Sequence, residues 1–360
     1  MATKLNNKIN AGYCLSEMAD IVEIILTLRQ LRRKRKKCYI TVLPLTLLKK
    51  SLDQIVDFLQ NVVLTEAQAL LLMSCGQTSC FESLKKVLTG IKQSVPPKCA
   101  ITGGTFNFVL GTKHLPCDPG IGSNFRDELF GNNPMQPQTT SRISSNLGMI
   151  LIPRTPDVQV SDFYVPLRNK YKGLEGLGSF LPDMDLPVRL VLVFIHPLSL
   201  GKLTKFAVTC KSKYGNEVVL AGCYSQDFVF FKNMATHHEI AGLVVSGNIK
   251  AATVVIPYGR DNEDFIGNVI TTSERILGTN FTLALANTFA LMFFPNLTFM
   301  QEVSLLTIIR DKFPNVPFLC SQGPAAYGCD TVKLEAEGRV AGGRDYLQRD
   351  AGVIVFMSIL

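Results

Sequence analysis

The feature of this sequence that most constrains its fold is an order of elements that recurs along the chain. The first copy has an apolar run at residues 69–73, an amphipathic helix from about residue 81, a second strand ending at Gly103-Gly104, and a later hairpin at 147–165. A second copy begins with an apolar strand at residues 188–195, and a third, looser copy begins at 281–286. Repeated strand, helix, strand and hairpin units predict a mixed α/β fold, with mixed sheets flanked by helices.

The composition changes along the chain and indicates three parts. Residues 1–37 hold one short helix and a basic segment, residues 38–165 hold the first copy of the repeat, and residues 166–360 hold the other two. Between residues 111 and 145 the chain is rich in Pro, Gly, Asn, Thr and Ser and poor in apolar side chains, so we expect a long mobile loop there.

Cysteine content and hydropathy restrict the class of protein. The chain has 10 Cys but only 4 His, and no Cys pair has the two-residue spacing of a zinc ribbon, so we expect reduced thiols, no metal and no cofactor. The longest apolar stretch, residues 281–294, is shorter than the roughly 20 residues that a bilayer requires, so we expect no membrane span. The first residues lack the apolar core of a secretory signal, and we expect the protein in the cytoplasm and nucleus.

The positive charge is concentrated in one segment. The formal net charge is +8, and residues 29–37 supply seven of the positive charges without any acidic residue. We therefore do not expect nucleic acid as a partner of the main domain. The segment is interpreted as a nuclear-import patch, and a solvated helix face is the alternative. The patch comprises Arg32, Arg33, Lys34, Arg35, Lys36 and Lys37.

The sequence resembles the F-box only protein 22 family. Residues 188–194, 218–222, 251–255, 312–317 and 328–330 are similar, in this order, to the FIST domain of that family. Residues 15–27 resemble the first helix of its F-box, which docks on the Skp adaptor of cullin-based (SCF) ubiquitin ligases. The resemblance implies FIST N-terminal and C-terminal domains and a substrate-recognition subunit that promotes proteasomal degradation of a bound protein, without being an enzyme itself.

The resemblance and the repeat suggest two sets of site residues. A stripe at helical spacing would contact the adaptor, and it comprises Leu15, Met18, Ile21, Val22 and Ile25. Glycines and polar residues after the strands would form a substrate or ligand pocket, which comprises Gly222, Cys223, Gly323, Tyr327, Cys329 and Asp330.

The sequence also departs from the family. The chain passes from Leu28 directly into the basic segment and has no Trp, so the F-box is truncated and adaptor binding is expected to be absent or weak. A FIST binding module without ligase coupling is therefore the alternative. A third class, an enzyme using Cys329 or His238, has the least support, because no His lies near Cys329 in the sequence and the adjacent Asp330 raises a thiol pKa.

Overall fold

The structure is a computed structural model that describes residues 39–44, 67–75, 81–111, 146–166, 173–196, 203–236, 240–277, 288–314 and 316–360. The chain divides into two compact units, Met1–Lys37 and Cys38–Leu360, and all described residues belong to the second. The adaptor stripe, the basic patch, His238, the expected strand 281–286 and residues 112–145 of the expected loop lie outside the described residues.

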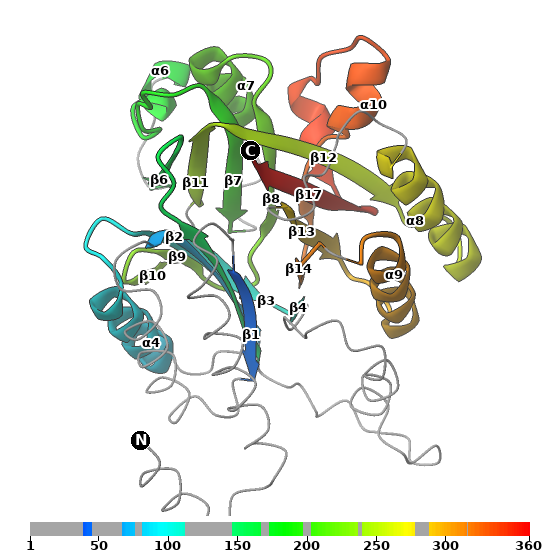
Figure 1. Cartoon of the computed structure of the whole chain (residues 1–360), viewed down its shortest axis with the longest axis horizontal. Helices are drawn as coiled ribbons and strands as arrows, with labels where there is room; N and C mark the ends of the chain where they lie inside the picture. The colour runs from blue at the N-terminus through cyan, green and yellow to red at the C-terminus, as the bar shows by residue number, and fades with distance from the viewer. Residues whose placement is uncertain are drawn as a thin grey trace, which may run out of the picture. The chain divides into compact units, whose positions relative to one another are not determined.

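Three mixed sheets make up the described part (Figure 1). Sheet A has the order β1-β5-β2-β3-β9-β10, with β1 Tyr39–Pro44, β2 Ala67–Cys75, β3 Ala100–Phe106, β5 Asn146–Pro153, β9 Val229–Phe231 and β10 Met234–Thr236. Sheet C has the order β16-β15-β8-β7-β11-β6, with β6 Val158–Val165, β7 Val188–Ile195, β8 Val219–Tyr224, β11 Ile240–Gly247, β15 Ala326–Gly328 and β16 Leu347–Gln348. Sheet B has the order β12-β17-β13-β14-β4, with β4 Phe108–Gly111, β12 Ile249–Pro257, β13 Thr288–Pro295, β14 Phe318–Gly323 and β17 Ala351–Ile359.

Each sheet is built around one parallel strand pair joined by a helix. Helix α4 (Phe81–Ser94) connects β2 to β3, α7 (Leu203–Tyr214) connects β7 to β8, and α9 (Phe299–Lys312) connects β13 to β14. The other helices are α6 (Gly173–Gly178), α8 (Asn262–Leu277), α10 (Thr331–Ala336) and the 3-10 helix η5 (Gly343–Tyr346). The expected mixed α/β fold with flanking helices is confirmed.

The three sheets exchange strands in a cycle. After the second parallel strand, the chain continues into another sheet: β4 pairs with β14, β9 pairs with β3, and β15 pairs with β8. The strand pairs expected to form hairpins also divide between sheets, because β5 lies in sheet A and β6 in sheet C, while β11 lies in sheet C and β12 in sheet B. A local turn signal does not reveal which sheet the next strand joins, so these expected hairpins are wrong.

The exchange joins the sheets through one shared core. A cluster of buried residues, here called the inner core, has members from all three sheets, such as Leu71 of β2, Leu192 of β7 and Leu291 of β13. The opposite face of each sheet is covered by its own helices. Because central strands are buried on both faces, β7 reads VRLVLVFI with almost no alternation.

Other elements differ from the sequence expectations. Helix α8 was not expected, although Phe265, Val269 and Ile276 form an apolar stripe on it. The first strand of the third copy is β13 at Thr288–Pro295. The division at residue 166 stays a prediction, and strand pairs such as β6 with β11 and β3 with β9 cross it. No helix in the described ranges is long and apolar enough to span a membrane.

Candidate functional site

The residues expected to form a pocket meet where β8 and β15 run side by side in sheet C. Gly222 of β8 stands opposite Tyr327 of β15, and Cys223 stands opposite Ala326. Cys329 and Asp330 follow directly after β15. The structure therefore brings together residues that lie about a hundred positions apart in the sequence.

The two glycines serve close backbone contacts. A Cβ on Gly222 would lie 1.8 Å from the carbonyl oxygen of Val193, its partner on the parallel strand β7. A Cβ on Gly323 would lie 2.2 Å from the carbonyl oxygen of Tyr224. Real side chains cannot make such contacts, so strand packing accounts for both glycines without a ligand.

Cys223 lies on the face of sheet C that belongs to the inner core. Its Sγ is 3.9 Å from Oγ of Ser321 on β14, and both side chains are buried. Burial holds the pKa of this thiol well above its ordinary value, because a thiolate would lose its hydration there. Cys223 is therefore a protonated thiol at neutral pH.

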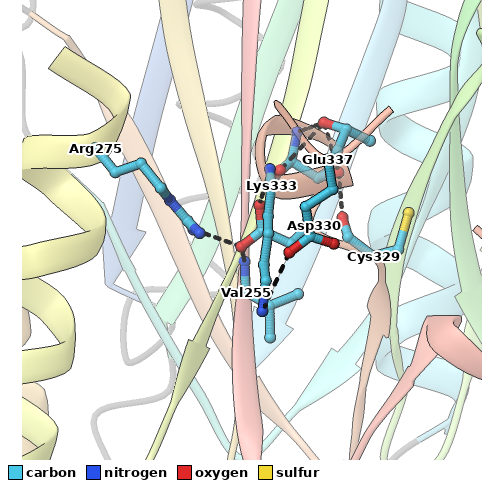
Figure 2. A network of polar contacts seen from close by, with 8 residues as sticks. Val255, Arg275, Cys329, Asp330, Lys333 and Glu337 are labelled. Carbon is cyan, nitrogen blue, oxygen red and sulfur yellow. Dashed lines mark hydrogen bonds and ion pairs between the residues drawn. The ribbon is translucent and has the colours of Figure 1, made fainter. Parts of the chain in front are cut away.

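Asp330 ties three elements together. Its Oδ1 accepts a hydrogen bond from the backbone of Lys333 and so caps α10, while its Oδ2 accepts from the backbone of Val255 on β12 and from the Arg275 guanidinium on α8. In Figure 2, Arg275 approaches the carboxylate from one side and the sulfur of Cys329 lies on the other. With both oxygens occupied, Asp330 has a structural role that needs no ligand.

Neighbouring bonds fix the same segment to β12. The hydroxyl of Thr253 donates to the carbonyl oxygen of Cys329, and the hydroxyl of Thr331 donates to the carbonyl oxygen of Thr253 at 3.1 Å. The backbone N–H of Thr253 donates in turn to the Thr331 hydroxyl at 2.8 Å. The peptide around Cys329 is therefore held rigidly, and its thiol is directed away from β12 and toward α7.

The Cys329 thiol lies in a polar cluster under α7 and η5. The hydroxyl of Tyr346 hydrogen-bonds the sulfur, and the Tyr346 ring stacks on Tyr327 with 5.4 Å between centroids. Nζ of Lys211, from α7, lies 5.5 Å from the centroid of the Tyr346 ring and donates to the carbonyl oxygen of Ala341 at 2.7 Å. A thiol, a phenol and an amine from three separate segments thus surround one point.

Burial shifts the pKa values in this cluster toward neutral groups. It raises the pKa of the Cys329 thiol, which the Tyr346 hydrogen bond and the Lys211 charge partly offset. It lowers the pKa of the Lys211 amine, an effect opposed by Cys329 and Asp345. The favoured resting state is therefore a neutral thiol beside an amine whose proton is held less tightly than usual.

The sequence analysis found part of this cluster. It named Tyr327 and Cys329, but it missed Lys211 and Tyr346, because neither a sequence motif nor a short spacing links them to Cys329. Within the described ranges, no group of three or more His, Cys, Asp or Glu side chains could hold a metal ion. Cys99, Cys210, Cys223, Cys320 and Cys329 are all free and buried.

Comparisons with known proteins identify no family for this chain. No family model and no curated protein matches it. Among solved structures it is similar to cyanuric acid hydrolase from A. caulinodans, with 7% identity and a TM-score of 0.37 over 90% of this chain and 99% of that one. A second structure, described as "Cyanuric acid hydrolase: evolutionary innovation by structural concatenation", has 8% identity and a TM-score of 0.35 over 90% of this chain and 99% of that one.

These findings correct the family interpretation. No family model or curated protein supports the resemblance, and neither of the two solved structures named is an F-box or FIST protein, so the assignment to the F-box only protein 22 family is wrong. The interpretations that rested on this assignment, namely a ubiquitin-ligase receptor, a FIST binding module and a protein that is not an enzyme, are therefore also wrong. Three of the matched pieces lie in β7, β8 and β12, where burial alone selects Val, Leu and Ala.

Proposed function

We propose that the chain is an enzyme that transfers or hydrolyses acyl groups, with Cys329 as its nucleophile and Lys211 as its general base. The hydrogen bond from Tyr346 to the Cys329 sulfur, with the Lys211 amine beside the same ring, supports this proposal most strongly. The pKa directions agree with it, since the lowered pKa of Lys211 increases the fraction of neutral amine, the form that accepts the proton that the thiol loses on attack. The TM-scores of the hydrolases are too low to contribute.

The proposed reaction has two steps. The Cys329 sulfur bonds to the acyl carbon while Lys211 takes the thiol proton, and the leaving group departs with that proton to give a thioester. Water then adds to the thioester carbon, and the acid leaves as the thiol regains its proton. The Tyr346 hydroxyl stabilises negative charge on the sulfur by donating to it.

Access to the sulfur requires a local movement. Cys329 is 3% exposed and Tyr346 is 1% exposed. The segment that leads into η5 contains Val340, whose side chain is 63% exposed and so makes few contacts with the rest of the protein. Few buried contacts hold this segment, so its opening is the step that admits a substrate. We also propose a reducing compartment, cytoplasm or nucleus, which suits a catalytic thiol.

The test uses p-nitrophenyl acetate, an activated acyl ester. The full chain should release p-nitrophenolate in a burst and carry an acetyl group on Cys329, located by peptide mass spectrometry. Cys329→Ser should abolish the burst, and Lys211→Met should slow it about a hundredfold, the usual scale of general-base catalysis. Cys210→Ser is the matched control, because Cys210 is a buried thiol next to Lys211 whose pKa is raised by burial alone. A burst that survives Cys329→Ser would disprove the proposal.

A further inference from the structure

Tyr224, the last residue of β8, carries a polar group without a partner. Its side chain is 1% exposed, and its hydroxyl is buried without a hydrogen bond. The backbone of the same residue is satisfied, since its N–H donates to the carbonyl oxygen of Ala325 at 2.9 Å. A buried hydroxyl that stays unpaired destabilises the folded chain, so this position calls for an acceptor from outside the chain.

Strand register places a cation beside this hydroxyl. Gln348 of β16 stands opposite Ala326 of β15, which stands opposite Cys223 of β8. Continued one residue beyond the ends of β15 and β16, the same register aligns Arg349 and Ala325 with Tyr224 in one row. Side chains alternate along strands, and Tyr224 and Ala325 belong to the cluster on the helix-covered face of sheet C, so the row places Arg349 on that face as well.

The row has only a small side chain between the phenol and the guanidinium. Ala325, the residue between them, contributes only a methyl group. Arg349 is exposed, whereas Tyr224 is buried, so the row is open to solvent at its Arg349 end. Within the described ranges, no carboxylate forms an ion pair with Arg349. The charge of Arg349 acts on the Tyr224 phenol, which agrees with the placement from the register.

We propose that the Tyr224 hydroxyl and the Arg349 guanidinium bind a carboxylate group of the substrate. A carboxylate accepts the hydrogen bond that Tyr224 cannot make within the protein, and it pairs with the guanidinium through its second oxygen. A neutral amide of the same shape would lack the charge that Arg349 attracts.

The position of this site also defines the substrate class. Residues 325, 327 and 329 lie on one face, so the row at Ala325 and the Cys329 thiol are four residues apart, about 13 Å at 3.3 Å per residue. The substrate is then an acyl compound whose carboxylate is separated from its reacting carbonyl by an extended chain. This substrate class rests on the proposed function, whereas the carboxylate site itself does not.

The experiment measures binding in the absence of turnover. Propionate and propionamide, which match in size, are titrated by calorimetry into the full chain carrying Cys329→Ser. We expect propionate to bind, propionamide to bind at least tenfold more weakly, and high salt to weaken propionate binding. In the same background, Tyr224→Phe and Arg349→Gln should each weaken propionate binding about tenfold.

Two matched controls keep the result specific. Tyr214→Phe removes a hydroxyl that already donates to the carbonyl oxygen of Pro182, and Arg339→Gln removes an exposed guanidinium that pairs with Glu337. Both should bind propionate like the parent. Equal binding of the acid and the amide, or no loss in both Tyr224→Phe and Arg349→Gln, would overturn the carboxylate site. If propionate binds as expected but Cys329 is never acylated, the catalytic proposal fails and the carboxylate site stands.

Discussion

Sheets B and C share one plan but differ in what lies between the parallel strands and their helix. In sheet C, α7 covers β7 and β8, and Lys211 meets the Tyr346 ring above the Cys329 thiol. In sheet B, α9 covers β13 and β14, and Glu302 lies one turn before the buried residues Leu305 and Leu306. The thiol in sheet C has hydrogen-bonding and charged partners, whereas no charged or hydrogen-bonding group acts on the Glu302 carboxyl in sheet B.

The difference shows in the pKa values. Burial raises the pKa of Glu302 to about 7, and no charged or hydrogen-bonding group offsets the effect. For the Cys329 thiol, Tyr346 and Lys211 offset part of the rise in pKa that burial causes. The same backbone plan can therefore hold either a carboxyl with a pKa near neutral pH or a thiol with a phenol and an amine beside it. Side-chain partners, and not topology, decide which chemistry a sheet can support.

The largest expected effect is loss of folding, and it tests whether sheets B and C fold together as one unit. Val193 of β7 and Met292 of β13 are both fully buried on the helix-facing side of their sheets. An unpaired buried carboxylate costs several kcal/mol, comparable with the roughly 5 to 15 kcal/mol that stabilises a domain. Val193→Asp and Met292→Asp should each abolish soluble expression.

The shared inner core gives the reason, since it has members from all three sheets. Differential scanning calorimetry of the parent chain should accordingly show one unfolding transition for residues 38–360. A soluble Val193→Asp protein in which sheet B unfolds cooperatively by itself would mean that the sheets are independent units.

The second effect tests the close approach of β8 to β7 in sheet C. Gly222→Ala forces a methyl group against the Val193 carbonyl, and such overpacking should lower the free energy of unfolding by about 3 kcal/mol. The matched control is Gly267→Ala in α8, next to sheet B, where nothing lies within 4 Å of the new methyl group. That change should raise stability by about 0.5 to 1 kcal/mol, because alanine favours a helix. Urea titration of the two variants should give shifts of opposite sign.

How far the sequence could predict the fold is clear from these strands. The apolar run at 188–195 and its parallel partner were predictable, because burial on both faces leaves a continuous apolar pattern. The exchange of β4, β9 and β15 between sheets was not, since each has only three or four residues and pairs with a strand far away in sequence. The turn at Gly247, with φ +100°, fits a hairpin and a crossing between sheets equally well.

The candidate site was predictable only where it follows a strand. Gly222, Tyr327 and Cys329 follow or lie in strands, and the alternation of apolar residues locates them. Lys211 is one of several lysines near the end of α7, and only the packed structure shows that it meets Tyr346. Arg349 likewise acquires significance only through the register of β16 with β15.

The third effect is a pH dependence in sheet B. The pKa of Glu302 is about 7 in the folded chain and lower in the unfolded chain, so the folded state binds more protons between the two values. Stability should therefore fall as the pH rises from about 4.5 to 7 and then stay level. Glu302→Gln removes this loss, and the variant should be about 3 kcal/mol more stable than the parent at pH 8 and nearly equal to it near pH 4.5.

Urea unfolding at the two pH values measures this difference. The matched control is Glu274→Gln on α8, whose carboxylate is largely exposed and pairs with Lys312 of α9 at 3.0 Å. That variant should be no more stable than the parent at either pH. Equal stability of Glu302→Gln and the parent at pH 8 would show that the Glu302 carboxyl is solvated like an ordinary surface group.

The smallest effect isolates what Lys211 contributes in sheet C. The Lys211 charge lowers the pKa of the Cys329 thiol, so Lys211→Met should reduce the fraction of thiolate. The higher thiol pKa should slow the reaction of Cys329 with iodoacetamide at pH 8, because the thiolate is the reactive form. Cys320 of sheet B provides an internal control, because it is buried beside Glu302 and its pKa is not influenced by Lys211. Peptide mass spectrometry follows both thiols in one sample. If Lys211→Met slows alkylation of Cys329 and Cys320 equally, the substitution changes how often the folded chain opens and not the pKa of Cys329. The proposed electrostatic difference between sheets B and C would then be wrong.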